Sequence, residues 1–321
     1  MSKVVGIGAC VMDTLITVPN YPKEDTKLRA LSSKAAGGGP TATGLVAVSK
    51  LGVSAAYVGV LARDNGGSFL LEDFQRYGVD TSFVEVKEGY RSFTSTIWLA
   101  KDAATRTCVF DKGDLPPLAL DEEKCKAIAE AQILMIDGNE MDAAEEACKL
   151  ARQKGTKVLY DCGGLYQGVE RLLKLTDVMI PSEEFALGHT GCKTAEEAAV
   201  KLYEMYHPEV VVITCGKEGG VIYEQGIDCG ADENSTSHGN AVAAGIERYP
   251  AFVVDAVDTN GSGDVFHGAF AAAMIKGYSY QDCCVFASAV SALKCTGYGA
   301  RESVPGERAV YAFLESRGVV L

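Results

Sequence analysis

A short glycine-rich stretch near residue 260 holds the residue types best suited to phosphate chemistry. It runs from Asp258 to Asp264 as Asp-Thr-Asn-Gly-Ser-Gly-Asp, and an alanine-rich apolar run that predicts a helix follows it. The first amides of a helix have no partner inside the helix, so the N–H groups of Gly261, Ser262 and Gly263 predict an anion-binding site. Glycine at these positions also lets the backbone approach a phosphate closely.

Asp264, at the start of this predicted helix, supplies the second group that phosphoryl transfer requires. Its carboxylate can accept the proton of an incoming hydroxyl, while the amides of the turn stabilise charge on the transferring phosphate. We therefore predict that Asp264 is the catalytic base and that Gly261, Ser262 and Gly263 form the anion hole. The alternative is that Asp264 only caps the helix, a role in which aspartate is common.

The elements that would position this turn alternate between strands and helices. Apolar runs rich in β-branched residues predict buried strands at 4–7, 56–60, 133–136, 158–160, 178–180 and 210–214. Helical patterns lie between several of them, at 41–50, 67–77, 140–154 and 195–205. This alternation predicts an α/β fold of Rossmann-like type, in which helices cover both faces of a mainly parallel sheet. Ligands of such folds bind beyond the carboxyl ends of the strands.

Two segments, 14–34 and 84–113, break this rhythm with residues that alternate between apolar and polar. A period of two predicts antiparallel strands in a separate small sheet. Because both segments follow core strands, we expect this sheet to act as a lid over the site, with residues 1–13, 35–83 and 114–321 forming the core. The alternative is a pair of ordinary hairpins packed on the core. The polar, glycine-rich stretch 226–245 predicts a long loop.

Charge and cysteine content narrow the class of function. The chain has 321 residues and a formal net charge of −13, which disfavours nucleic acid and anionic membranes as partners. Its eleven cysteines are scattered and include no C-x-x-C pair, as expected for reduced thiols in the cytoplasm. No apolar run approaches the roughly 18 residues of a membrane span, and the first residues show no secretion pattern. We predict a cytoplasmic location.

Three motifs together resemble the ribokinase-like (pfkB) carbohydrate kinases. Residues 258–264 resemble the family signature D-T-x-G-A-G-D, with Ser262 in place of alanine. Residues 36–43 resemble the N-terminal glycine motif, and residues 213–220 resemble the V-T-x-G-x-x-G turn of the nucleotide pocket. Further similarity at 6–13 and at 299–305 extends the resemblance over nearly the whole chain.

The resemblance implies a three-layer Rossmann-like core with a β-sheet lid, ATP and Mg²⁺ as co-substrates, and transfer to a sugar hydroxyl with Asp264 as base. Separately, pairing of the exposed lid sheet between subunits would bury its open face, so we expect a homodimer formed through the lid. The positions that match the nucleotide site are Thr214, Gly216, Gly219, Gly261 and Gly263. The positions that match a monovalent-cation site, for K⁺, are Asp258, Asn260, Gly299 and Ser303.

The expected acceptor contacts are Asp13, Gly38, Gly39, Thr43, Lys27, Asn139 and Asp264. Ribokinases proper carry Lys and Asn where this chain has Pro40 and Thr43, so ribose is not the first choice. Motifs at 9–13, 264–268 and 292–296 look closest to the branch of sulfofructose kinases and related ketose kinases. A sulfonate would need cations, for which Lys27, Arg91 and Arg106 are candidates, but 137–139 adds a carboxylate instead. We favour an uncharged ketose or polyol.

One motif departs from the family pattern. The N-x-x-E that helps to organise the metal should fall at 182–185, where this chain has Ser182 and Phe185. Glu183 or Glu184 is left as a candidate Mg²⁺ ligand, with water and the nucleotide phosphates as the alternative.

Other functions are weaker alternatives. A nucleoside kinase shares the same motifs, and a non-catalytic sugar sensor on the same fold would be expected to have lost Asp264. A nicotinamide-dependent oxidoreductase is suggested by Gly6-x-Gly8, but Val11 replaces the third glycine of that motif. The chain contains no G-x-x-x-x-G-K-[ST] sequence, so a P-loop phosphotransferase is unsupported.

Overall fold

The computed structural model describes residues 2–102, 105–224 and 245–321. Within these ranges the strands form two sheets, and the larger one has the order β13-β12-β11-β10-β9-β8-β1-β4-β5. Its strands are β1 (Val4–Ile7), β4 (Ala55–Ala62), β5 (Asp80–Lys87), β8 (Ile133–Ile136), β9 (Lys157–Cys162), β10 (Val178–Pro181), β11 (Val210–Thr214), β12 (Gly220–Glu224) and β13 (Ile246–Tyr249). All are parallel except β12 and β13, which close one edge as antiparallel strands. Each of the six predicted core strands is present.

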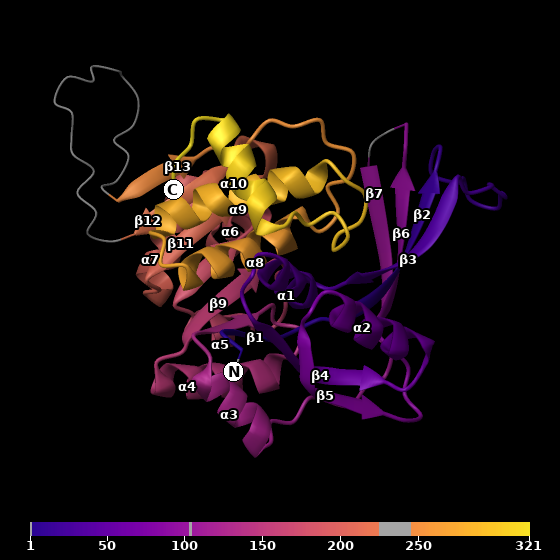
Figure 1. Cartoon of the computed structure of the whole chain (residues 1–321), viewed down its shortest axis with the longest axis horizontal. Helices are drawn as coiled ribbons and strands as arrows, with labels where there is room; N and C mark the ends of the chain where they lie inside the picture. The colour runs from indigo at the N-terminus through magenta and orange to yellow at the C-terminus, as the bar shows by residue number, and fades with distance from the viewer. Residues whose placement is uncertain (1, 103–104, 225–244) are drawn as a thin grey trace.

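Helices cover both faces of this sheet, which confirms the three-layer prediction (Figure 1). One face carries α1 (Pro40–Lys50), α2 (Asn65–Arg76), α8 (Ser262–Ile275), α9 (Tyr280–Cys295) and α10 (Glu307–Ser316). The other carries α3 (Glu122–Glu130), α4 (Met141–Lys154), α5 (Glu170–Leu173), α6 (Glu183–Thr190) and α7 (Ala195–Tyr206). Successive strand residues enter opposite cores, as Val4 and Val5 do, because strand side chains alternate between faces.

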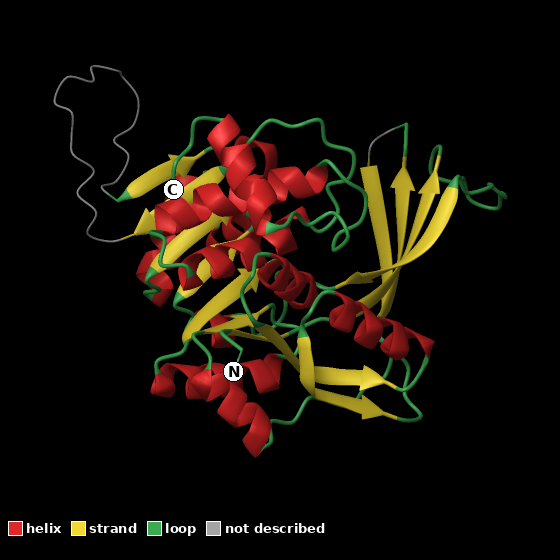
Figure 2. Ribbon diagram, viewed as in Figure 1, coloured by secondary structure: helices red, strands yellow, loops and turns green. Residues whose placement is uncertain are grey.

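The smaller sheet has the order β3-β2-β6-β7 and stands beside the large sheet (Figure 2). Its strands are β2 (Val11–Val18), β3 (Ser32–Gly38), β6 (Thr94–Ala100) and β7 (Thr105–Asp111). We call this sheet the lid. The prediction of antiparallel strands holds for two of its pairings, but β2 and β6 run parallel, because β6 enters the lid after the crossover through α1, β4, α2 and β5.

The predicted boundaries between core and lid differ from the observed ones. Residues 84–87, predicted to lie in the lid, continue β5 and pair with β4 in the large sheet. Residues 11–13 and 35–38, predicted to lie in the core, already belong to lid strands. The alternation of residues along a chain identifies a strand but not the sheet that it joins, and this explains both differences.

Local geometry agrees with several smaller expectations. Gly52, Gly78 and Gly155 follow α1, α2 and α4 with φ angles of 81°, 72° and 82°, the left-handed conformation that ends a helix at glycine. The loop predicted at 226–245 lies outside the described residues except for Gly245. Among the described residues, no helix combines the length and apolar character that crossing a lipid bilayer requires.

Candidate functional site

A cavity of about 820 Å³ lies between the lid and the carboxyl ends of the core strands. Lid residues such as Ser95 and Arg106 form one wall, and the turn before α8 forms another. Four carboxylates line the cavity, and they come from β2, the end of β8, β9 and the first turn of α8: Asp13, Asp137, Asp161 and Asp264. We call this space the acceptor cavity.

The predicted anion hole lies at the N-terminal end of α8. Gly261 precedes the helix with a φ of 72°, and a Cβ atom on it would lie 2.6 Å from the Cβ of Ala300. Both the conformation and the space therefore require glycine here. Gly261, Ser262, Gly263 and Asp264 all line the acceptor cavity, so the structure brings the predicted base and hole together.

Asp264 lies in the first turn of α8 and is partly buried. Burial raises the pKa of its carboxyl group, while the nearby charges of His267 and Arg106 oppose the shift. A carboxylate with a raised pKa is a stronger base, which suits a group that must accept a proton from a hydroxyl.

Asp13, on lid strand β2, is buried and accepts a 2.6 Å hydrogen bond from Ser95 Oγ. Burial raises its pKa to about 6, and the Ser95 hydrogen bond opposes the shift. Gly38 packs against it so closely that a Cβ atom there would lie 2.1 Å from Asp13 Oδ2. Gly39 has a φ of 92° and abuts the carbonyl oxygen of Ala9. The predicted acceptor contacts Asp13, Gly38 and Gly39 thus form one wall of the cavity.

Asp137, at the end of β8, is held by backbone amides. Its carboxylate accepts hydrogen bonds from the amides of Ala9 (2.8 Å), Thr41 (3.1 Å) and Asn139 (2.9 Å). These bonds join the ends of β1 and β8 to the start of α1. Asn139 lines the cavity as predicted, and its Nδ2 donates to Glu140 at 3.2 Å.

Asp161 and His267 form a buried pair that sequence reasoning missed. Nδ1 of His267 lies 3.2 Å from Asp161 Oδ2 and 2.7 Å from the carbonyl oxygen of Gly263, while Nε2 lies 2.9 Å from that of Ile180. This arrangement suits a ring with a proton on each nitrogen. Burial raises the pKa of Asp161 to about 7, and His267 opposes the shift. The place of Asp161 at the carboxyl end of β9 was the available signal.

Arg106 joins the lid to the core. Its Nη1 donates a 2.6 Å hydrogen bond to Oδ1 of Asn260, the residue before Gly261. The guanidinium group of a lid strand therefore reaches the edge of the anion hole.

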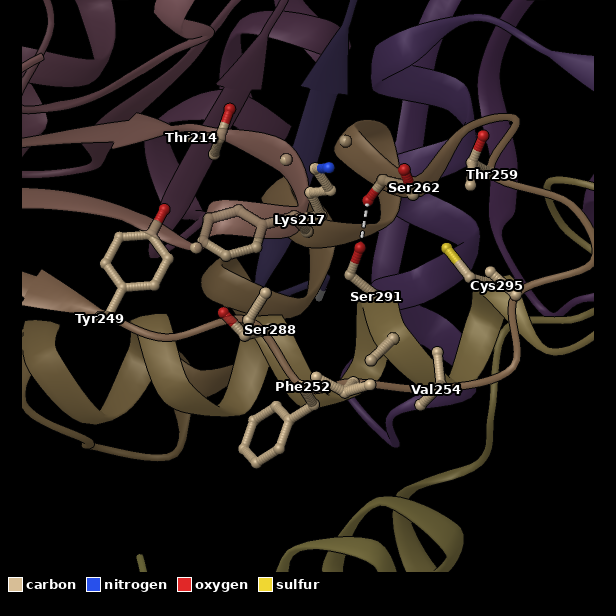
Figure 3. Close-up of a pocket in the computed structure, with 18 residues that line it drawn as sticks. Thr214, Lys217, Tyr249, Phe252, Val254, Thr259, Ser262, Ser288, Ser291 and Cys295 are labelled. Carbon is tan, nitrogen blue, oxygen red and sulfur yellow. Dashed lines mark hydrogen bonds between the residues drawn. The ribbon is translucent and has the colours of Figure 1, made fainter. Parts of the chain in front are cut away.

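A second cavity, of about 520 Å³, opens on the other side of the anion hole (Figure 3). Thr214, Gly216 and Gly219 line it as predicted, at the turn between β11 and β12. Tyr249, Phe252 and Val254 add apolar surface, and Ser291 Oγ donates a 2.9 Å hydrogen bond to the carbonyl oxygen of Ser262. We call this space the nucleotide cavity, because Ser262 and Gly263 line both cavities and would lie between a nucleotide and its acceptor.

Comparison with known proteins agrees with this geometry. The model of the pfkB family of carbohydrate kinases matches residues 1–307. The chain belongs to this family. It is 25% identical to a ribokinase of Haemophilus influenzae over 315 residues, covering 96% of this chain and 97% of the relative. It is also 25% identical to mouse ketohexokinase over 303 residues, covering 91% and 96% of the two chains.

Solved structures show the same fold. The ribokinase of Arabidopsis thaliana, complexed with ribose and ATP, superposes with a TM-score of 0.84 at 22% identity and covers 98% of this chain and 99% of its own. The ribokinase of Thermotoga maritima superposes with a TM-score of 0.80 at 23% identity and covers 98% and 100%. The protein is a carbohydrate kinase with an alcohol group as acceptor.

Some predicted acceptor contacts of this pfkB kinase lie outside the acceptor cavity. Thr43 is fully buried on α1, where its Oγ1 accepts a 3.4 Å hydrogen bond from Arg301 Nε. Lys27 is exposed in the connection between β2 and β3 and does not line the cavity. Arg91 pairs with Asp111 and Asp114 on the lid surface. Thr43 follows the glycine motif closely in sequence, but the helix turns its side chain inward.

The candidate metal ligands of the altered N-x-x-E motif are not brought into either cavity. Ser182 caps α6 by accepting a hydrogen bond from the amide of Phe185, which is buried in the core. Glu183 and Glu184 are exposed and line neither cavity. Within the described ranges, no group of three or more His, Cys, Asp or Glu side chains could hold a metal ion.

Arg301 lies in the segment 299–305, and the sequence alone did not indicate a role for it. It is buried behind the glycine loop, where Nη2 donates a 2.6 Å hydrogen bond to the carbonyl oxygen of Gly38 and Nη1 pairs with Asp73 at 2.7 Å. It thus links the segment near residue 300 to the loop that faces the acceptor.

The residues expected to hold a monovalent cation do lie together. Asp258 accepts 2.8 Å hydrogen bonds from the amides of Asn260 and Gly299, and Ser303 Oγ donates to the carbonyl oxygen of Gly299 at 2.5 Å. A lysine occupies this group as well: Lys294 Nζ donates a 2.7 Å hydrogen bond to the carbonyl oxygen of Asp258.

Proposed function

We propose that this kinase transfers the γ-phosphoryl group of ATP to a hydroxyl of an uncharged ketose or related polyol, with Asp264 as base. The observation that carries the proposal is that Asp264 lines the acceptor cavity beside Ser262 and Gly263, which line both cavities. A hydroxyl in the acceptor cavity would contact a γ-phosphate bound at the N-terminal end of α8.

The geometry supports an in-line displacement. The acceptor hydroxyl gives its proton to Asp264 while its oxygen forms a bond to the γ-phosphorus, and the bond to the β-phosphate oxygen breaks to release ADP. The amides of Gly261, Ser262 and Gly263 stabilise the charge on the transferring group. Binding under the lid excludes water, which would otherwise compete as the acceptor.

The charges of the acceptor cavity favour an uncharged substrate. Four carboxylates line it, whereas the described lining residues that can carry a positive charge are Arg106, Lys112 and His267, and His267 pairs with Asp161. Arg106 is already engaged by Asn260. A sulfonate or carboxylate would therefore meet a net negative surface, while the hydroxyls of a polyol can donate to these carboxylates.

We propose that Mg²⁺ enters with the nucleotide. The ion would be bound mainly by the ATP phosphates and water, and it would neutralise phosphate charge.

The decisive experiment is a coupled ADP-release assay with Mg·ATP against ketoses, aldoses, sugar acids, sulfofructose and nucleosides. We expect turnover on a ketose or polyol. We expect Asp264→Asn to lower kcat by roughly 10³-fold or more and to leave ATP binding intact, because the variant keeps the shape but not the basicity of the residue. Near-normal turnover by Asp264→Asn would remove it from the role of base, and silence of the wild-type protein across the panel would count against the proposed acceptor class.

A nucleoside is the second candidate acceptor, supported by a further cavity of about 330 Å³ that adjoins the first. The two share Phe93, Lys112, Asn139 and Met141 as lining residues. Tyr57 and Pro117 give the extra space apolar walls that suit a flat ring. Preferential turnover of a nucleoside in the same assay would favour this candidate over the ketose.

We also propose that the protein acts in the cytoplasm as a homodimer formed through the lid. The lid exposes large apolar side chains, including Val109, of which 65% is exposed, and Leu31. Pairing of two lids would bury this surface. Sedimentation velocity should detect a dimer, and a monomer at high protein concentration would contradict the proposal.

A further inference from the structure

Lys294 is a lysine with no exposed side-chain surface, close to the anion hole. It lies in the last turn of α9, its side chain is 0% exposed, and its Nζ donates to the carbonyl oxygen of Asp258 at 2.7 Å. The same Nζ lies 4.0 Å from Asp258 Oδ1. Lysine is almost never fully buried without a partner, because removal of its charge from water is costly. Asp258 is the partner that offsets this cost.

Asp258 in turn holds two loops together. Its Oδ1 accepts the amide of Asn260 and its Oδ2 accepts the amide of Gly299, each at 2.8 Å. Asn260 directly precedes Gly261 of the anion hole. Ala300, next to Gly299, packs against Gly261 so tightly that no Cβ fits between them. The carboxylate of Asp258 therefore fixes both sides of the phosphate-binding turn.

A positive charge at this place stabilises the buried carboxylate and carbonyl oxygen of Asp258. The lysine ammonium is a compact point charge with three donors, similar in size to a potassium or ammonium ion. Burial lowers the pKa of Lys294, and the negative charge of Asp258 opposes that shift. The ammonium thus binds the carbonyl oxygen of Asp258, within the group of residues that was expected to hold a monovalent cation.

We propose that Lys294 is a built-in cation, which holds Asp258 and the anion-hole turn in place and makes the kinase independent of K⁺ and other monovalent cations. Lys294 is a positioning residue, because it acts on the phosphate through Asp258 and the turn. The proposal rests on the proposed kinase reaction for its activity readout and adds to that reaction the absence of a cation requirement. It also revises the expectation of a K⁺ site at Asp258, Asn260, Gly299 and Ser303.

The first test uses the wild-type protein and exchanges K⁺ for N-methylglucamine at constant ionic strength. Turnover on the best acceptor of the panel and the thermal midpoint Tm with Mg·ADP should both stay unchanged. A rise of turnover or of Tm that is specific to K⁺ or NH₄⁺ would overturn the proposal.

The second test compares two variants of the lysine. Lys294→Ala leaves space for an ion, so we expect Tm to fall by on the order of 10 °C and the KM for ATP to rise about tenfold, with K⁺ or NH₄⁺ restoring part of both. Lys294→Met fills the space without a charge. We expect the same fall in Tm and the same rise in the KM for ATP, and addition of K⁺ should restore neither.

A lysine far from the site serves as the matched control. Lys124 is also buried, and its Nζ donates to Glu85 at 2.6 Å and pairs with Asp121. Lys124→Ala should lower Tm with no response to K⁺ and no change in the KM for ATP. If Lys294→Ala behaved in this way too, Lys294 would be only a packing residue and the proposal would be wrong.

The outcomes separate this inference from the proposed function. Absence of turnover on every acceptor would count against the proposed substrate class, yet the Tm measurements with Mg·ADP would still test the built-in cation. If Lys294→Ala does not fold, the wild-type comparison and Lys294→Met still decide the question.

Discussion

The two cavities on either side of the anion hole are built in opposite ways. The nucleotide cavity is lined by residues that all lie between 214 and 295, and its described lining contains no carboxylate. The acceptor cavity draws its lining from Ala9 to Ala300, uses both sheets and includes four carboxylates. One cavity offers shape and backbone groups, and the other offers charges.

This difference explains how one fold can keep its nucleotide and change its acceptor. A cavity made from one continuous part of the chain needs few coordinated changes to persist. The acceptor cavity depends on single side chains from separate elements, such as Asp13 from the lid and Asp161 from β9. Each buried carboxylate lowers stability unless it is paired, so its presence indicates a functional use.

The substitution Asp13→Asn tests most directly whether the two cavities bind their substrates independently. If Asp13 binds acceptor hydroxyls, its loss should lower kcat/KM for the acceptor by about 100-fold, the usual worth of a hydrogen bond to a charged group, and should leave the KM for ATP unchanged. Steady-state kinetics with each substrate varied in turn measures both. A similar rise in the KM for ATP would show that the two cavities are not independent.

The same substitution should reveal the cost of the buried charge. Burial raises the pKa of Asp13 to about 6 from an ordinary value near 3.8. A raised pKa in the folded state means that the stability from this group is present below about pH 4 and is lost as the pH rises through 6. Asparagine does not ionise, so Tm of Asp13→Asn should exceed that of wild type by a few degrees at pH 8 and match it at pH 4.

The sequence was most informative where local order determines structure. The turn at 258–264 and the helix after it are contiguous, so residue types alone predicted that Gly261–Gly263 and Asp264 would lie together. The alternating strands and helices likewise predicted the layers of the core. Of the residues expected to contact the acceptor, Gly38 and Gly39 line the acceptor cavity, whereas Thr43 lies on α1 with its side chain towards Arg301.

What the sequence did not reveal depends on partners distant along the chain. Lys294 meets Asp258 across 36 residues, and Arg301 meets Gly38 across 263. Nothing in the residues beside Lys294 indicates that its ammonium is buried. His267 pairs with Asp161 of β9, 106 residues earlier in the chain, and only the packing of α8 against β9 brings the two together.

A substitution in the nucleotide cavity tests the same independence, with a smaller expected effect. Ala292 on α9 is buried and lines the nucleotide cavity. Ala292→Leu would project three carbons into the cavity, so we expect the KM for ATP to rise roughly tenfold while the KM for the acceptor and Tm change little. Ala292→Ser, which adds a single atom, is the matched control and should bind ATP nearly normally. Equal rises of both KM values in Ala292→Leu would contradict the assignment of this cavity to the nucleotide alone. Crowding in one cavity would then alter binding in the other through Ser262 and Gly263, which line both.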